Sequence, residues 1–400
     1  MSEAAASLPS RRRVVAAVGL GQLLAWASSY YLLAILAKPM ATGLGLPPVA
    51  VYGAFSAALL VGALLGPMAG GLVDRHGGRQ VLLTSNGIFA LGLTLLATAQ
   101  GPISLTLGWL VIGAAMPMGL YDAAFATLVR LYRNDARRSI VGVTLIAGFA
   151  SSVSWPVSAL LESHYGWRVA CAVWAGLHLT VGAAIHYFGV PRIKPVPVAA
   201  TQTSASEMVA PVVASSTFWI LAAVFTANGF IFSAMAAYLP RVLQAVGCTP
   251  AAAVAAASLI GVFQVAARVA DASLLHRLNP LISGRIAAAL HPIGAALLII
   301  FGAPVAVLFT ALHGAGIGLM TIVKGTLPLA LFGPAGFGRR SGLLEAPSRV
   351  AQAVTPVVFG LWLDAWGAQV LWISGLVGFA GLSGLLFLRR RTTAGIKKAD

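Results

Sequence analysis

Long apolar segments follow one another along this sequence, separated by short stretches that hold most of the charges. A helix needs about 20 apolar residues to cross the hydrocarbon core of a bilayer. The segments are hydrophobic almost throughout and lack the ten-residue alternation of a β-barrel, so each predicts a transmembrane helix. We expect twelve spans, at roughly residues 14–38, 49–72, 80–99, 103–129, 140–162, 168–190, 213–239, 251–275, 284–301, 304–332, 342–363 and 368–388.

The composition excludes a water-soluble globular fold. Apolar residues make up 59% of the chain and charged residues 9%, too few to cover a surface in water. The apolar run after the basic residues 11–13 continues to Lys38, which is the length of a span rather than of a cleaved signal core. Two cysteines, Cys171 and Cys248, are too few for a disulfide framework or a cysteine-based metal site. We predict an all-α polytopic membrane protein without a metal or cofactor.

The positive charges are unevenly distributed between the predicted loops. Of 26 Lys and Arg residues, 20 lie in the N-terminal segment, the C-terminal tail and every second loop between them. The loops on the opposite side hold three, and three more fall inside the spans. Cytoplasmic segments of membrane proteins carry the positive excess. This distribution predicts a plasma (inner) membrane protein with both termini in the cytoplasm, and it explains the net charge of +16 without a nucleic-acid partner.

The chain divides into two similar halves. Residues 191–212 are rich in Pro, Ser, Thr and Ala and lack an apolar period, which is typical of a linker. Residues 136–139 (Ala-Arg-Arg-Ser) recur 202 positions later as 338–341 (Gly-Arg-Arg-Ser). Membrane transporters are often built from such duplicated halves. We expect two pseudo-symmetric six-helix bundles, at 1–190 and 213–400, joined by a cytoplasmic linker.

Between the second and third predicted spans stands the segment Gly70-Gly71-Leu72-Val73-Asp74-Arg75-His76-Gly77-Gly78-Arg79. It resembles the loop 2–3 signature of the major facilitator superfamily (MFS), G-x-x-x-D-(R/K)-x-G-(R/K)-(R/K), with Gly78 in place of one basic residue. The resemblance implies the MFS fold and transport by alternating access. It also implies a conformational latch at the cytoplasmic helix ends, formed here by Gly70, Asp74, Arg75, Gly77 and Arg79.

Three glycines precede this signature at intervals of four residues, Gly62, Gly66 and Gly70. They leave one face of the second predicted span without side chains. We expect another helix to approach closely there.

A second resemblance covers the region between spans 4 and 6. Residues 132–138 (Tyr-Arg-Asn-Asp-Ala-Arg-Arg), followed by Gly142, Ala147 and Gly148, are similar to the entry of helix 5 in the monocarboxylate-porter and oxalate-formate antiporter-like branch. Those carriers move small carboxylates together with protons. The lysine of their first helix has no counterpart, because Lys38 lies at the outer end of span 1, where it serves as an interfacial anchor.

Six charged residues lie in the interior of the predicted spans, away from the span ends. A charge at the middle of the bilayer costs about 2.5–3.5 kcal/mol on insertion scales and normally faces a cavity or a partner. Arg268 and Asp271 are three residues apart, and Glu345 and Arg349 are four apart. Each of these two pairs shares a helix face and is expected to neutralise itself, either in the substrate site or as a structural ion pair. The six are Asp122, Arg268, Asp271, Lys324, Glu345 and Arg349.

Asp122 and Lys324 have no opposite charge one turn away on their own helices. They lie 202 residues apart, which is the offset of the repeat, so the two halves place them at equivalent positions. We expect them to pair across a central cavity, where Asp122 accepts the coupling proton and Lys324 meets the substrate anion. A permanent structural salt bridge is the alternative.

Polar and aromatic residues within the spans are candidates to complete the site: Gln22, Trp26, Tyr30, Tyr121, Asn228, Gln264, His291 and Gln352. For each of them, interfacial anchoring or helix packing is the alternative role.

The sequence has no catalytic signature and no phosphate-binding loop, so we do not expect an enzyme. We predict a monomeric secondary active transporter, coupled to protons as a symporter or antiporter, with a small monocarboxylate-like anion as substrate. Its expected partners are this solute, protons and the lipid bilayer. An exporter of lipophilic or cationic compounds and a transporter-like receptor remain as alternatives.

Overall fold

A computed structural model describes residues 10–192, 212–275 and 279–388, and every regular element in these residues is helical. The first half contains α1 (Arg11–Ala27), α2 (Tyr30–Gly43), α3 (Pro48–His76), α4 (Gly78–Ala97), α5 (Pro102–Gly119), α6 (Tyr121–Tyr132), α7 (Ala136–Ala147), α8 (Ala150–Leu177) and α9 (Ala183–Gly189). The second half contains α11 (Ser216–Ala245), α12 (Pro250–Ser258), α13 (Ile260–Ala270), α14 (Pro280–Phe301), α15 (Ala306–Phe332), α16 (Phe337–Trp366) and α17 (Val370–Phe387). Two π-helical turns occur at His178–Gly182 and Asp271–Leu275.

Ten helical intervals of the described residues are long and apolar enough to cross a membrane. The last interval, Phe337–Phe387, contains both α16 and α17, separated by a short turn at Gly367–Gln369. α8 is likewise interrupted at Gly166, whose φ of 80° is not helical. The chain is therefore a multi-pass helical membrane protein, as predicted, whereas the number of twelve spans stays a prediction.

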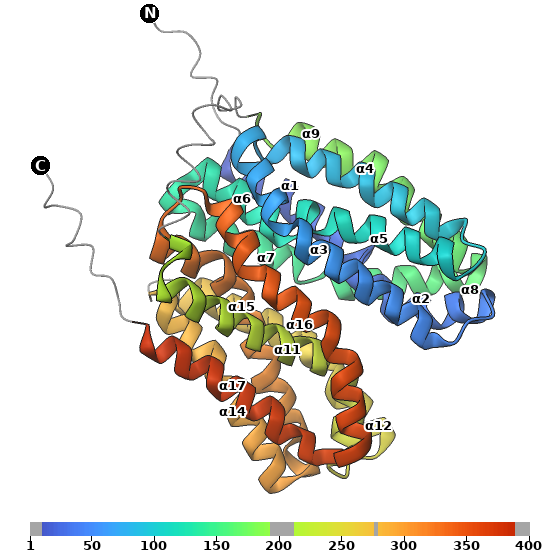
Figure 1. Cartoon of the computed structure of the whole chain (residues 1–400), viewed down its shortest axis with the longest axis vertical. Helices are drawn as coiled ribbons and strands as arrows, with labels where there is room; N and C mark the ends of the chain where they lie inside the picture. Colours follow the sequence, from blue (N-terminus) through green and yellow to red (C-terminus); the bar gives the residue numbers. More distant parts are fainter. Residues whose placement is uncertain (1–9, 193–211, 276–278, 389–400) are drawn as a thin grey trace, which may run out of the picture.

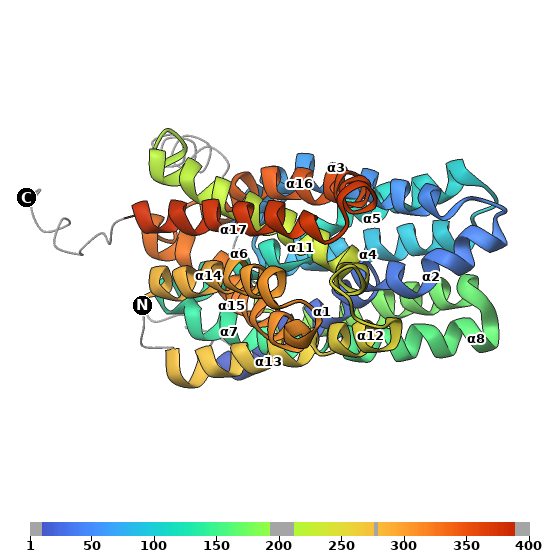
Figure 2. The ribbon, with the colours of Figure 1, turned by 90° about the horizontal axis from the view of Figure 1, so that it is seen from below.

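The helices form two groups, which we call the N-terminal bundle (α1 to α9) and the C-terminal bundle (α11 to α17) (Figure 1). Helices α3 and α16 run side by side where the bundles meet (Figures 1 and 2). We call the end of the molecule where α1 begins and α17 ends the basal end. The bundles diverge toward the opposite end, which carries α2 and α12 (Figure 1). The predicted linker at 191–212 lies almost entirely outside the described residues.

Several spans are broken near their middle. Ser28 and Ser29 separate α1 from α2, and Ser29 has non-helical torsion angles (φ −123°, ψ −90°). Leu120 separates α5 from α6 in an extended conformation, three residues after Pro117, which cannot donate a helical hydrogen bond. Broken spans of this kind are tolerated where the freed backbone is buried in protein or faces a cavity.

The expected close approach at the glycine stripe is present, and the neighbouring helix is α16. Gly66 and Gly70 of α3 face Gly342 and Gly338 of α16, backbone against backbone. A Cβ atom at Gly342 would lie 2.5 Å from the carbonyl oxygen of Gly66, so no side chain fits between the helices there. This contact closes the basal end between the two bundles.

Candidate functional site

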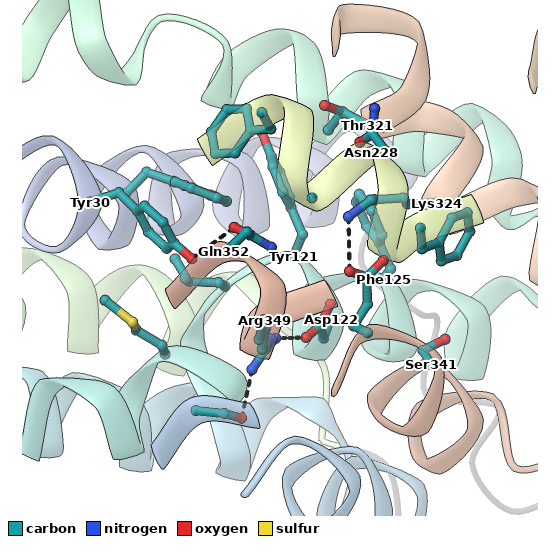
Figure 3. Close-up of a pocket in the computed structure, with 18 of the residues that line it drawn as sticks. Tyr30, Tyr121, Asp122, Phe125, Asn228, Thr321, Lys324, Ser341, Arg349 and Gln352 are labelled. Carbon is teal, nitrogen blue, oxygen red and sulfur yellow. Dashed lines mark hydrogen bonds and ion pairs between the residues drawn. The ribbon is translucent and has the colours of Figure 1, made fainter. Parts of the chain in front are cut away.

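A cavity with a volume of about 140 Å³ lies between the two bundles (Figure 3). It is at the level of the helix breaks at Ser28–Ser29 and Leu120, because Leu120 and residues close to both breaks line it. Both bundles contribute to its lining. Eleven of the fourteen predicted substrate or coupling residues line it: Trp26, Tyr30, Tyr121, Asp122, Asn228, Gln264, Arg268, Lys324, Glu345, Arg349 and Gln352. The structure thus brings together side chains that are more than 300 residues apart in the sequence, as in the hydrogen bond from the Tyr30 hydroxyl to Oε1 of Gln352 (3.4 Å).

Two of the predicted residues lie inside a single bundle instead. Gln22 is fully buried, and its Nε2 donates to the carbonyl oxygen of Gly119 (2.6 Å), which ties α1 to the end of α5. His291 contacts His313 through their Nδ1 atoms (3.0 Å) between α14 and α15. Both side chains satisfy polar groups in helix packing, so the alternative role applies to them and they do not line the cavity.

An ion pair connects the two bundles at the cavity. Arg349 of α16 donates to the carboxylate of Asp122 in α6 and, through Nη1, to the carbonyl oxygen of Gly62 in α3 (2.9 Å) (Figure 3). Asp122 lies in the first turn of α6, where the helix N-terminus favours a negative charge. The expected partners were different: Asp122 was predicted to pair with Lys324, and Arg349 with Glu345 four residues before it. Both predictions are wrong for this conformation, because two helices of the N-terminal bundle offer Arg349 a carboxylate (α6) and a backbone carbonyl (α3) at once.

The second ion pair of the cavity lies within the C-terminal bundle. Lys324 of α15 donates to Glu345 of α16 at 2.8 Å, and the two side chains are 22% and 11% exposed (Figure 3). Both residues are carried by the same bundle, so this pair can persist when the bundles move relative to each other.

Arg268 of α13 is the third base of the cavity, and it is 5% exposed. It donates to the carbonyl oxygen of Thr144 in α7 (3.3 Å) and to the hydroxyl of Thr321 in α15 (3.5 Å). Its Nε has no hydrogen-bond acceptor, and no acidic side chain of the described residues forms an ion pair with it. Neutral oxygens thus surround a buried positive charge.

Asp271 was predicted to neutralise Arg268, and the structure corrects this as well. Asp271 is 1% exposed, lies outside the cavity lining, and forms an ion pair with Arg137 of α7 at 4.0 Å. Asp271 is the first residue of a π-helical turn. The predicted pairing assumed a regular α-helix with 3.6 residues per turn, and a π-helical turn departs from that geometry.

Sequence reasoning did not single out several other residues that line the cavity, among them Phe125, Phe225, Phe232, Phe337, Thr321 and Ser341. Four of them are phenylalanines, which are equally common on lipid-facing helix surfaces. Only the positions of neighbouring helices distinguish a cavity phenylalanine from a lipid-facing one, so no local signal was present.

The predicted latch lies at the basal end. Asp74, in the last turn of α3, accepts hydrogen bonds from the backbone N–H groups of Gly338 (3.2 Å) and Arg339 (3.0 Å) in the first turn of α16. A carboxylate is stabilised there because the N–H groups of a helix N-terminus lack partners and carry partial positive charge. Asp74 of the N-terminal bundle thereby holds the first turn of the C-terminal bundle's α16.

Gly70 also faces the C-terminal bundle, at Gly338 of α16, whereas the other three latch residues lie within the N-terminal bundle. Arg75 lies in the last turn of α3, where its charge complements the helix C-terminus. Gly77, with a φ of 87°, forms the turn from α3 to α4. Arg79 stacks on the Tyr187 ring at 4.2 Å. Gly78 abuts the side chain of Thr127, so a larger residue does not fit at the position where the signature has a base.

Enlarging Gly70 should open the basal end. A side chain at this position collides with the backbone of Gly338, and overpacking costs about 1–3 kcal/mol. In a Ser341→Cys reporter with both native cysteines replaced by serine, Gly70→Leu should raise the rate of alkylation from the basal side about tenfold. Gly71→Leu is the matched control, because nothing lies within 4 Å of a Cβ there. Equal rates for the two variants would contradict a role of Gly70 in closure.

The two helical bundles of this membrane protein enclose a charged cavity and close against each other at one end. This is the architecture of a solute transporter. The sequence matches the profile of the Major Facilitator Superfamily over residues 18–321, which is more than half of the chain. The chain belongs to the Major Facilitator Superfamily, and this confirms the resemblance found at Gly70–Arg79. Members of this family are transporters rather than enzymes.

Solved structures of this family share the fold over nearly the whole chain. The human organic anion transporter MFSD10 (TETRAN) is 19% identical with a TM-score of 0.73, and the match covers 94% of this chain and 100% of that one. The MFS transporter FucP of E. coli, in the outward conformation, is 15% identical with a TM-score of 0.74, covering 95% and 99%. The proton:xylose symporter XylE is 16% identical with a TM-score of 0.73, covering 95% and 96%. Membership of the monocarboxylate-porter branch stays a prediction.

Proposed function

We propose that this protein carries a small organic anion across the inner membrane by alternating access, in a cycle coupled to protons. The two halves, residues 1–190 and 213–400, act as the moving units on either side of the cavity, and a single chain contains the complete pathway. The monocarboxylate-like substrate expected from the sequence falls within this class.

The unpaired charge of Arg268 is the observation that carries the proposal. The ionisable residues of the cavity lining are three bases and two acids. Each acid already pairs with a base, Asp122 with Arg349 and Glu345 with Lys324. Among the residues that the structure describes, Arg268 therefore has no counter-ion for its positive charge in a low-dielectric site, which is costly unless an anion neutralises it. A substrate anion supplies that counter-ion.

The same charge balance argues against an exporter of cations, the second class considered from the sequence. Such a site requires an acid without a base, whereas both acids of the cavity lining are paired. A structurally similar protein, MFSD10, is described as an organic anion transporter, which supports the proposed substrate class.

Proton coupling and orientation have separate support. FucP and XylE are described as proton symporters, so this fold supports coupling to protons. The distribution of Lys and Arg between the loops favours a cytoplasmic basal end. With that orientation, the contacts of Asp74 and Gly70 close the cavity toward the cytoplasm, as in an outward-facing state.

Arg268→Gln should weaken binding of small carboxylates about 10- to 150-fold, because a hydrogen bond to a charged group contributes about 1.5–3 kcal/mol. The variant should be as stable as the parent or more so, since it removes a buried charge that has no counter-ion. Counterflow of a labelled carboxylate in proteoliposomes measures transport, and thermal unfolding measures stability.

Arg241→Gln is the matched control. Arg241 forms an exposed ion pair with Asp364 outside the cavity lining, and exposed pairs contribute little to stability. Normal carboxylate counterflow in Arg268→Gln would place the anion site elsewhere. A large loss of stability in that variant would assign Arg268 a structural role.

A further inference from the structure

We propose that the transported anion has a flat aromatic body, which binds against an aromatic wall of the N-terminal bundle while its carboxylate binds Arg268 of the C-terminal bundle. This inference rests on the proposed function and narrows its substrate class to small aromatic carboxylates. The aromatic wall consists of Trp26, Tyr30, Tyr121 and Phe125, all of which line the cavity.

The aromatic wall is a continuous set of ring contacts. The ring centroid of Trp26 lies 4.9 Å from that of Tyr30 and 5.2 Å from that of Tyr121. Tyr121 in turn stacks on Phe125 at 5.1 Å with an interplanar angle of 19°. The break at Ser28–Ser29 and the start of α6 bring these rings together from separate helices. Rings in such arrangements gain about 0.5–1.5 kcal/mol beyond their buried area, a preference that extends to a planar ligand.

Trp26 also offers a donor that the protein does not use. Its Nε1 is buried and has no hydrogen-bond acceptor among the residues that the structure describes. The N–H group of a buried tryptophan normally finds a partner. Nε of Arg268 is likewise buried and has no hydrogen-bond acceptor among the described residues. Among the described residues, the cavity lining thus holds three buried polar groups without a partner: Nε1 of Trp26 in the N-terminal bundle, and Nε of Arg268 and the hydroxyl of Ser341 in the C-terminal bundle. The oxygens of a bound carboxylate or ring substituent supply acceptors for the N–H groups of Trp26 and Arg268.

Arg268 and the aromatic wall are close enough for one small molecule to reach both. Arg268 interacts electrostatically with Tyr31 and Tyr121, and Trp26 contacts these two rings at 6.1 and 5.2 Å. The cavity volume of about 140 Å³ accommodates about ten water-sized groups. A single aromatic ring with a carboxylate has about this size.

Calorimetric titration of the purified full chain in detergent tests the inference with four probes. Benzoate should bind about tenfold more tightly than cyclohexanecarboxylate, which has the same charge and similar size but no flat ring. Benzoate should also bind more tightly than acetate, which has the carboxylate but no aromatic ring. Benzamide, which has the ring but no charge, should bind at least about tenfold more weakly than benzoate.

Trp26→Leu should reduce benzoate affinity about tenfold and leave that of cyclohexanecarboxylate nearly unchanged. Trp372→Leu is the control, because Trp372 lies on α17 with 56% of its surface exposed and outside the cavity lining. If Trp26→Leu does not fold, the four probes on the unchanged protein still decide the question.

The outcomes separate the two proposals. Equal affinities for benzoate and cyclohexanecarboxylate would overturn the aromatic inference and leave an anion carrier in place. Benzamide binding as tightly as benzoate would show that the charge of Arg268 is not used, and both proposals would then fail. Binding of acetate alone would retain the proposed function and exclude the aromatic body.

Discussion

Replacing Arg349 by alanine should destabilise the folded protein by about 3–5 kcal/mol, the range observed when one partner of a buried ion pair is removed. The side chains of Arg349 and Asp122 are 12% and 18% exposed, so water screens the remaining carboxylate poorly. The variant also loses the hydrogen bond to the carbonyl oxygen of Gly62. Denaturant titration of the detergent-solubilised protein measures the change in the free energy of unfolding.

The double variant Asp122→Asn/Arg349→Gln should recover most of that loss, because both remaining groups are neutral and polar. Recovery by the second substitution is the result that distinguishes an ion pair from simple side-chain packing. If the double variant is less stable than Arg349→Ala, the cost comes from lost packing and the pair has little energetic significance.

Lys324→Ala provides a second comparison. It leaves Glu345 unpaired, so it should destabilise the fold as well, but this pair lies within one bundle. Of these two variants, only Arg349→Ala should increase the alkylation of the Ser341→Cys reporter, because the Arg349 ion pair joins the two bundles at the cavity and the Lys324 ion pair does not. An equal increase for both variants would mean that general destabilisation opens the basal end.

The sequence predicted the helical membrane fold and most of the residues that line the cavity, for reasons that are local to single segments, whereas the role of the latch stays a prediction. Asp74 stood out because its neighbours form a recognisable turn, and it contacts α16 at the basal end as expected of a latch. Asp122, Lys324 and Arg349 stood out because a charge inside a span needs a cavity or a partner, and all three line the cavity.

The partners of these charges could not be predicted in the same way. Spacing along one helix shows that Glu345 and Arg349 share a face, but it does not show what the facing helices offer. Arg349 binds Asp122 because α6 begins with that carboxylate opposite it, and Glu345 binds Lys324 because α15 passes beside α16. Ion pairing between helices is decided by tertiary packing, which these spacing rules do not contain.

Asp122→Asn should abolish accumulation of substrate driven by a pH gradient while leaving exchange of internal for external substrate intact. Asp122 and Arg349 are carried by different bundles, so their ion pair has to break when the bundles separate at this level. A carboxylate that loses its cation while it stays away from water takes up a proton, because its charged form is then costly. Asparagine cannot take up that proton, whereas exchange requires no net cycle of protonation.

Glu345→Gln is the matched variant for this prediction. Glu345 and its partner Lys324 are carried by the same bundle, so their ion pair does not have to break when the bundles separate and no protonation of Glu345 is required. We expect gradient-driven uptake to persist in Glu345→Gln at no less than about a tenth of the parental rate, a change of about 1.4 kcal/mol in the barrier. Both variants are reconstituted in proteoliposomes, and uptake is compared with and without an imposed pH gradient. Normal gradient-driven uptake by Asp122→Asn, together with its loss in Glu345→Gln, would assign proton coupling to the Lys324–Glu345 pair instead.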